Sequence, residues 1–290
     1  MADNSPHQSS LSKALGALSQ GHLSDAEDIC RTILQDEPTQ PDALHLMGLI
    51  SYRAGDVARC VDLISQAISS RPGFLDALLN LGNIYKEINA PVDAENCYRN
   101  VLSIQPGNVL ACNHLAEVLL AQGNLEAAIE MLDQSLQTDN RHPDTHFNLA
   151  KLFVNLGDTD QALVAFNNVI SLNPNFTIAH NDLGLLHLEL GNFEDAQACF
   201  QKALALEPEY VAALNHLGLV YKDVGEFDKA LHCFTSALSI KPDYYLAYSN
   251  LMIVLRAICG EDHGNSESTQ FIENVVSNLP DLSENNSKVR

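Results

Sequence analysis

Few residues in this sequence have the type and spacing that catalysis or metal binding requires. His142 and His146 lie four positions apart, which could present two imidazoles on one face of a helix to a metal ion. Pro143 stands between them, and proline favours the first turn of a helix, so a helix start is the preferred interpretation. His180 and His187 lie seven apart and are expected to be packed or to face a groove. We therefore expect no catalytic residues, no metal and no cofactor.

Motifs that define common active sites are missing from the 290 residues. The sequence has no G-x-x-x-x-G-K, G-x-G-x-x-G, G-x-S-x-G or H-E-x-x-H motif, and its carboxylates are dispersed. The 7 cysteines form no C-x-x-C pair, which disfavours a zinc site. Their odd number disfavours a disulfide framework and favours a reducing compartment. The chain is predicted to be non-catalytic and cytoplasmic.

One set of residues recurs at a fixed interval of 34 positions, and we call it the polar row. Its members are Ser12, Leu46, Asn80, His114, Asn148, Asp182, His216 and Asn250. An asparagine carboxamide offers both a donor and an acceptor, as a peptide unit does. One hydrogen bond contributes only about 0.5–1.5 kcal/mol, so several in series would hold an extended peptide without reading its sequence. The candidate binding residues are Asn80, Asn83, His114, Asn148, Asp182, His216 and Asn250.

A second interpretation of the polar row stays open. Its asparagines could simply solvate an exposed helix face, and the changes to histidine and aspartate weaken the idea of a uniform ladder. Further asparagines, Asn113, Asn181 and Asn215, stand one residue before three members of the row.

The polar row is part of an internal repeat with the same period of 34 residues. Proline recurs at Pro38, Pro72, Pro106, Pro174, Pro208 and Pro242, with Asn140 in the missing position. Glycine recurs at Gly21, Gly55, Gly123, Gly157, Gly191 and Gly225, with Asn89 in the missing position. A fixed period of this length is typical of a stack of identical two-element units.

The pattern within one unit predicts two helices. In residues 211–244, Leu214 and Leu217 begin an apolar stripe with helical spacing. Gly225 is expected to end that helix in the left-handed conformation, which glycine adopts readily. A second stripe follows until Pro242, because the residue before proline avoids the helical region. The pattern therefore predicts that each unit consists of a helix, a tight turn, a second helix and a short turn.

Two further patterns predict how these helices begin and dock. Polar residues able to cap the second helix follow the turn position at Asp56, Asn124, Asp158 and Asn192. Small residues alternate with large ones at the expected contacts, as with Gly184, Ala196 and Ala203 around Leu183 and Phe200. Small residues let two backbones approach closely, and the large neighbours fill the remaining volume.

These residues resemble the tetratricopeptide repeat family. The fullest match to its pattern is Leu214, Leu217, Gly218, Tyr221, Ala230, Phe234, Ala237 and Pro242. The resemblance covers about residues 7–259. It implies an all-α, right-handed solenoid, or superhelix, of antiparallel helix pairs, with a concave face that is lined by the first helix of each pair and binds partners.

The resemblance also implies a domain organisation. The expected parts are a flexible terminus over residues 1–6, seven units over 7–244 starting near residues 7, 41, 75, 109, 143, 177 and 211, a capping half-repeat over 245–259, and a polar tail over 260–290. Phe271, Val275 and Leu279 have helical spacing, so a short helix over 269–279 is predicted in the tail.

A narrower resemblance is to the repeat region of O-linked N-acetylglucosamine transferases. The sequence of residues 76–86 is similar to repeats of that family, and residues 241–252 with 255–259 are similar to its last repeat. In that family the repeats pass protein substrates to a sugar-transfer domain that follows them. Only 31 residues follow Cys259 here, so the resemblance implies substrate recruitment rather than sugar transfer by this chain.

The charge balance restricts the kind of partner. The sequence has 16 Lys and Arg against 37 Asp and Glu, a net charge of −21. Nucleic acids and anionic membranes need a basic surface, so both are disfavoured. No run of 18 apolar residues and no secretory signal are recognised, so no membrane association is expected. The expected partner is a neutral to basic protein or peptide, and self-association is an open alternative.

Overall fold

The structure is a computed structural model that describes residues 7–259. All regular elements in that range are α-helices, and they form two compact units, one within residues 1–141 and one within 142–290. The first unit contains α1 (Gln8–Ser19), α2 (Leu23–Asp36), α3 (Pro41–Arg53), α4 (Val57–Ser70), α5 (Leu75–Glu87), α6 (Pro91–Ile104), α7 (Val109–Ala121) and α8 (Leu125–Thr138). The second contains α9 (Pro143–Leu156), α10 (Thr159–Leu172), α11 (Thr177–Glu189), α12 (Phe193–Leu206), α13 (Val211–Asp223), α14 (Phe227–Ile240) and α15 (Tyr245–Cys259).

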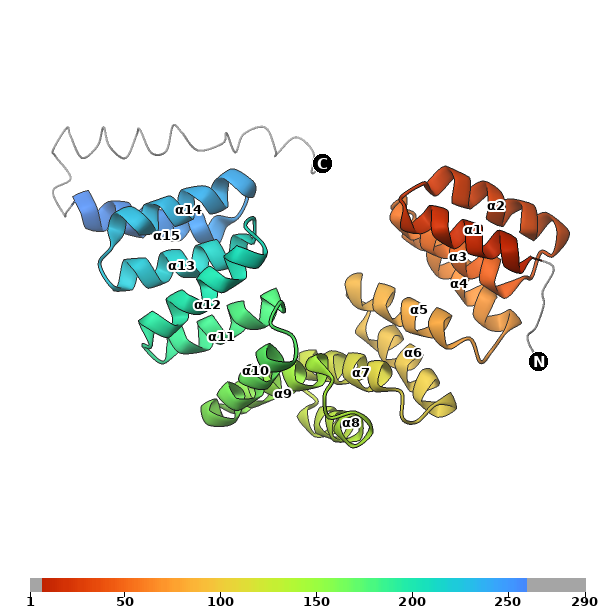
Figure 1. The fold of residues 1–290 in the computed structure, drawn as a ribbon, viewed down its shortest axis with the longest axis horizontal. Helices are drawn as coiled ribbons and strands as arrows, with labels where there is room; N and C mark the ends of the chain where they lie inside the picture. Colours follow the sequence, from red (N-terminus) through yellow and green to blue (C-terminus); the bar gives the residue numbers. More distant parts are fainter. Residues whose placement is uncertain (1–6, 260–290) are drawn as a thin grey trace. The chain divides into compact units, whose positions relative to one another are not determined.

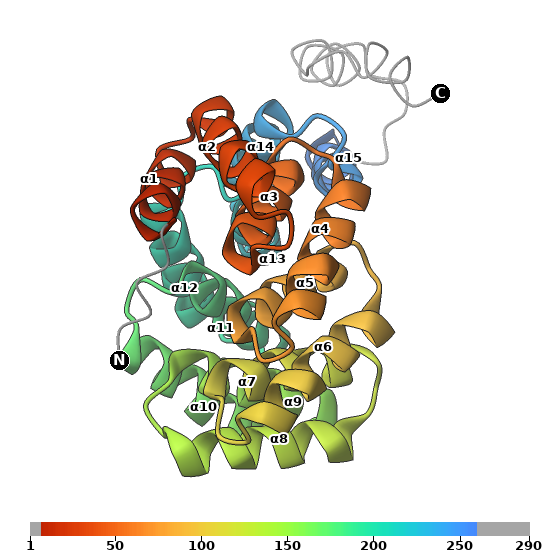
Figure 2. The same cartoon turned by 90° about the vertical axis from the view of Figure 1, so that its right-hand side faces the viewer.

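Within each unit the helices pack as successive pairs. Helices α1, α3, α5 and α7 each pack on the helix that follows, as do α9, α11 and α13 (Figure 1). Figure 2 follows the chain of the first unit from α1 and α2 through α3, α4 and α5 to α6, α7 and α8. The first helices of neighbouring pairs also touch, α1 with α3, α5 with α7, α11 with α13 and α13 with α15. The prediction of an all-α solenoid of helix pairs is confirmed, and the first helices form one face of each unit, which we call the first-helix face.

The turn between the two helices of a pair adopts the left-handed backbone conformation. The recurring glycines have positive φ angles, from 73° at Gly157 to 84° at Gly55. Asn89 fills the position where the glycine series is interrupted, and it is the one described residue other than glycine with a positive φ, 60°. Asparagine tolerates this conformation better than most residues with a side chain. The prediction that these positions end the first helix is confirmed.

Three of the four predicted caps of second helices are present. The side chains of Asp56, Asn124 and Asp158 accept from the backbone N–H three residues later, at 3.0, 3.4 and 3.2 Å. The prediction was wrong for Asn192, whose side chain makes no such bond. Its Nδ2 lies 3.5 Å from Nδ1 of His187 at the end of the preceding helix instead. This contact uses the amide nitrogen, whereas a cap would use the amide oxygen as acceptor, and that oxygen makes no cap bond.

The alternation of small and large residues sets how closely paired helices approach. A Cβ atom placed on Gly184 would lie 2.7 Å from Cε1 of Phe200, closer than two carbon atoms can pack. Ala196 and Ala203, on the same helix as Phe200, are fully buried at 0% exposed. The predicted docking of small against large side chains therefore fits the observed packing.

Two predicted features lie outside the described residues: the flexible terminus over residues 1–6 and the short helix over 269–279. Within residues 7–259, no helix combines the length and the apolar character that crossing a bilayer demands.

Candidate functional site

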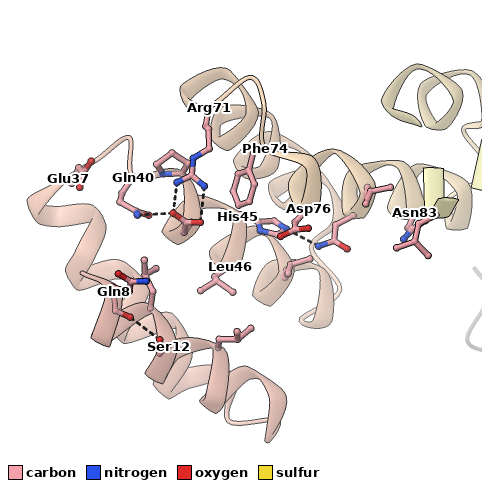
Figure 3. Close-up of a pocket in the computed structure, with 18 of the residues that line it drawn as sticks. Gln8, Ser12, Glu37, Gln40, His45, Leu46, Arg71, Phe74, Asp76 and Asn83 are labelled. Carbon is pink, nitrogen blue, oxygen red and sulfur yellow. Dashed lines mark hydrogen bonds and ion pairs between the residues drawn. The ribbon is translucent and has the colours of Figure 1, made fainter. Parts of the chain in front are cut away.

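The first-helix face of the first unit contains a cavity of about 810 Å³. Helices α1, α3, α5 and α7 line it, together with the turns that follow α2 and α4. The polar-row members Ser12, Leu46, Asn80 and His114 all line this cavity, and so does Asn83. Figure 3 labels Ser12, Leu46 and Asn83 among them. Three of the seven predicted binding residues therefore lie at one cavity.

The lining of this cavity combines apolar and charged side chains. Its apolar members include Leu15, Leu46, Leu49, Phe74, Leu79 and Leu110. Its charged members are Glu37, Asp42, Arg71 and Asp76. None of these charged residues is among the binding residues predicted from the sequence, although Asp42 and Asp76 are 34 positions apart and so share one position of the repeat.

An ion pair between Arg71 and Asp42 lies in this lining, where Figure 3 shows Arg71 between Gln40 and Phe74. The Arg71 guanidinium donates to both carboxylate oxygens of Asp42, at 3.1 and 2.6 Å. Its carbon Cζ also lies 4.5 Å from the centroid of the Phe74 ring. Burial alone raises the pKa of Asp42, but the hydrogen bonds and positive charge of Arg71 outweigh it and lower that pKa below its usual value. The charge of Arg71 is therefore already balanced within the protein.

His45 is a neutral acceptor beside that ion pair. The residue is buried, at 7% exposed, and its ring meets Phe74 edge-on with centroids 5.0 Å apart. Its Nε2 lies 2.9 Å from Nδ2 of Asn80, and because an amide nitrogen donates, Nε2 accepts. Burial lowers the pKa of His45, against the opposing effect of Asp76 and Asp42. The histidine thus fixes the orientation of the Asn80 side chain.

Asn83 and His114 are joined through a buried tyrosine. The Tyr98 hydroxyl donates to Oδ1 of Asn83 at 2.7 Å, and the Tyr98 ring is 0% exposed. The His114 ring lies tilted against it, with centroids 5.4 Å apart. Burial raises the pKa of Tyr98, so its hydroxyl remains a donor. Asn83 therefore directs its oxygen inward and keeps its amide N–H groups for other partners.

In the second unit, three members of the polar row take part in two separate hydrogen-bonded groups. Asn181 donates to Asp182 Oδ1 at 3.0 Å, and its own oxygen lies 3.0 Å from Nδ1 of His216. Asn250 donates to Oδ1 of Asn215 at 2.9 Å. Burial raises the pKa of Asp182 and lowers that of His216. Three of the predicted binding residues are therefore held by neighbours on the same face.

Asn148 differs from the other predicted binding residues. It is buried, at 5% exposed, whereas the remaining six are partly exposed. Ser12 is exposed and donates to the backbone oxygen of Gln8 at 3.0 Å, while Leu46 is buried. The polar row is thus not a uniform series of solvent-facing groups.

Sequence reasoning missed a recurring contact between neighbouring repeats. In three places the residue before a row member bonds to the row member of the next repeat, 35 positions later: His45 with Asn80, Asn181 with His216, and Asn215 with Asn250. The asparagines that stand one residue before members of the row were the sequence feature that could have predicted these contacts. The polar row therefore links repeats in addition to lining their exposed face.

Two histidines that were considered as metal or groove residues, His142 and His180, contribute to a helix start and to the packed interior. His142 stands at the N-cap of α9 and Pro143 is the first residue of that helix, so the predicted helix start is confirmed. His180 is buried and its Nε2 lies 3.0 Å from the Pro174 carbonyl oxygen. Within residues 7–259, no three histidine, cysteine or acidic side chains are grouped so that they could hold a metal ion.

Three cysteines share one position on second helices and fill apolar space. Cys97 and Cys233 are buried, and Cys199 is partly buried. Burial raises the pKa of each of these thiols to about 11, so they stay protonated at neutral pH. They therefore lack the thiolate character that nucleophilic chemistry needs.

The sequence and the fold can be compared with those of known proteins. Models of the tetratricopeptide repeat match residues 89–146, 119–181 and 176–243. A solved tetratricopeptide repeat protein from Parabacteroides merdae superposes with a TM-score of 0.71 at 20% identity, over 86% of this chain and 98% of that one.

Among curated proteins, the chain is similar to the probable UDP-N-acetylglucosamine–peptide N-acetylglucosaminyltransferase SPINDLY of Hordeum vulgare, with 28% identity over 155 residues. It is also similar to trafficking protein particle complex subunit 12 of Mus musculus, with 27% identity over 138 residues. These matches cover 51% and 44% of this chain, but 16% and 17% of the two relatives. The chain thus spans about a sixth of each relative's length. Together with the helix pairs and their turn glycines, the family matches establish that the chain belongs to the tetratricopeptide repeat family.

Proposed function

We propose that this chain is a non-catalytic scaffold that binds an extended segment of a protein partner along its first-helix face. The observation that carries the proposal is the position of Asn80, Asn83 and His114, which are partly exposed at one cavity. A repeat protein of this fold is suited to protein–protein interaction. The net charge of −21 favours a neutral to basic partner.

The amides of the polar row can still bind a peptide after their internal contacts are made. Asn80 and Asn250 each use one amide N–H for a neighbouring repeat. A carboxamide has a second N–H and an oxygen, which match the carbonyl and the N–H of a peptide unit. The row therefore supplies both donors and acceptors to an extended backbone.

The proposal is tested with peptides selected from a random dodecapeptide library on the full chain. Isothermal titration then measures the affinity of the selected peptides for the unaltered chain and for one variant in each unit, Asn80→Ala and Asn250→Ala. Each variant is expected to weaken the peptides that bind on its own unit roughly 2- to 12-fold, the equivalent of one hydrogen bond. Asn100→Ala and Asn168→Ala are the matched controls, since both asparagines are exposed on second helices.

The controls are expected to leave the affinity unchanged, and circular dichroism monitors folding of all four variants. Equal affinity of the row variants and the controls would show that the segment does not bind the first-helix face. Failure of the library to yield any binding peptide would also count against the proposal.

A second candidate function is recruitment of substrates for a peptide N-acetylglucosaminyltransferase-like protein. The similarity to SPINDLY of Hordeum vulgare supports it, together with the likeness of residues 76–86 and 241–252 to that kind of repeat. Calorimetry with UDP-N-acetylglucosamine tests whether this chain itself binds the sugar donor. A nucleotide-sugar domain encoded in the same reading frame would favour this candidate over an independent scaffold.

Self-association through the exposed convex face, which lies opposite the first-helix face, is a third candidate arrangement. Sedimentation velocity at several concentrations distinguishes it, because a self-associating chain shows a rising sedimentation coefficient. A coefficient that does not change with concentration would count against self-association.

A further inference from the structure

We propose that the cavity of the first unit selects a partner segment in which a lysine or arginine lies next to an aliphatic or aromatic residue. This proposal rests on the proposed function, because it assumes that a segment binds along the first-helix face. Two properties of the lining support it: negative charge that the protein does not balance, and apolar side chains that remain accessible.

The charged lining has an excess of carboxylates. Arg71 is its one cation among the lining residues, and Asp42 holds it in a two-point ion pair. Asp76 is exposed and forms no ion pair with any residue that the structure describes. Glu37 has His7 at 4.0 Å, and a histidine balances charge only when it is protonated. The cavity therefore favours a cation from outside, which would approach Asp76.

The apolar lining supplies the second half of the proposed recognition. Leu15 and Leu110 both line the cavity and are 55% and 46% exposed. Leu46 and Phe74 line it as well, and both are buried beneath the surface. Exposed aliphatic side chains around a hollow are stabilised when a partner's apolar side chain covers them. An apolar residue of the segment would thus supply affinity.

The proposed segment needs both the cation and the apolar residue, because neither contact is sufficient by itself. An ion pair at an exposed carboxylate contributes little by itself, so a lone lysine would bind weakly. An apolar residue alone would not distinguish this cavity from other apolar surfaces. An acidic segment is disfavoured, because Asp76 and Glu37 would repel it. The combination of a cation and a neighbouring apolar side chain fits the lining best.

The test repeats the random dodecapeptide selection on the full chain and on three variants. Asp76→Asn removes the unbalanced charge at the cavity. Asp144→Asn is the matched control, since Asp144 and Asp76 both occupy the second position of a first helix and carry the acidic charge of its first turn. Leu110→Ser tests the apolar half at a position exposed enough to tolerate the change.

Peptides selected on the unaltered chain are expected to carry lysine or arginine within two positions of an apolar residue. Asp76→Asn is expected to weaken a selected peptide about 1.5- to 5-fold, and the loss should shrink as salt screens the charge. Leu110→Ser is expected to weaken the same peptide, and Asp144→Asn to leave its affinity unchanged. Selection on Asp76→Asn should no longer enrich lysine and arginine.

The outcomes separate this proposal from the proposed function. Selected peptides without a preference for lysine or arginine, or equal effects of Asp76→Asn and Asp144→Asn, would overturn the selectivity of the cavity. The proposed function would survive in that case if Asn80→Ala still weakened the peptides. If no selected peptide responds to Asn80→Ala or Asn250→Ala, the proposed function fails, and this proposal fails with it.

Discussion

Gly218 marks a close approach between helices α13 and α14, and one added methyl group tests whether that approach is required. A Cβ atom at Gly218 would lie 2.5 Å from Cε1 and 2.8 Å from Cζ of Phe234. Carbon atoms in contact lie about 3.5–4.0 Å apart. Phe234 is 0% exposed, so its ring cannot swing into solvent. Gly218→Ala must therefore separate the two helices or force the ring into a poor rotamer.

The expected magnitude follows from two opposing effects. Inserting a methyl group into a packed core destabilises a protein by about 1–3 kcal/mol. Replacing glycine with alanine inside a helix stabilises it by about 0.5–1 kcal/mol. The net prediction for Gly218→Ala is a loss of about 1 kcal/mol in the free energy of unfolding. Gly16→Ala is the matched control, because Gly16 lies inside α1 and its added Cβ would have nothing within 4 Å beyond its chain neighbours and its own helix backbone, so this change should stabilise the chain.

A second substitution tests whether the ring is the cause. Ala116 and Leu132 occupy the corresponding positions of the fourth repeat, and both are 0% exposed. Copying that pair, Gly218→Ala with Phe234→Leu, relieves the clash. The double variant is therefore expected to lose less stability than the sum of the two single variants, with a coupling of about 0.5–3 kcal/mol.

Urea unfolding followed by circular dichroism measures these differences. Hydrogen exchange of α13 and α14 accompanies it, because repeats can unfold separately rather than in one transition. If the Gly218→Ala variant is as stable as the unaltered chain or more stable, the close approach of α13 and α14 does not require glycine at this position. Strictly additive effects of the two substitutions would refute the role assigned to the Phe234 ring.

Three other predictions concern buried polar groups. Tyr98→Phe removes a 2.7 Å hydroxyl bond and should lower the free energy of unfolding by about 0.5–1.5 kcal/mol in urea titrations, with unchanged stability contradicting the assignment. Burial lowers the pKa of His45 and His216, so the unfolded chain binds protons more readily. Stability should therefore fall as the pH drops below about 6.5, and unfolding at pH 7.5 and 5.5 should show a weaker dependence in His45→Asn. Burial raises the pKa of Cys30 and Cys60 to about 11, so a thiol reagent at pH 8 should label them only as fast as the chain unfolds. Rapid labelling of Cys30 and Cys60 in the folded chain would contradict their protection by burial.

The fold was predictable from the sequence because its determinants are local and repeated. The glycine series located the left-handed turns, and the interruption at Asn89 was filled by the residue type that best tolerates the same conformation. The cap at Asn192 was not predictable from position alone. Its oxygen makes no cap bond, and its amide nitrogen lies 3.5 Å from Nδ1 of His187, five residues earlier.

The candidate site was predictable only in part. The repeat period fixed where Asn80 and Asn250 lie on their helices, and both are partly exposed there. Their hydrogen-bond partners belong to the preceding repeat, and a pattern read within one repeat could not reveal them. The pair of Arg71 with Asp42 also joins residues 29 positions apart, from a turn and a helix, so it depends on how neighbouring pairs stack.

The contacts between repeats define what the polar row can offer to a partner. Asn80 is held by His45 through one amide N–H, so its oxygen and second N–H keep a fixed direction. Asn83 accepts from Tyr98 through its oxygen, which leaves both of its amide N–H groups for a partner. Side chains that are already oriented lose less conformational freedom when a partner binds, which favours affinity. The same hydrogen bonds that join the repeats therefore also prepare the face for binding, and a substitution such as His45→Phe should weaken a bound peptide in the cavity, because it releases the Asn80 side chain.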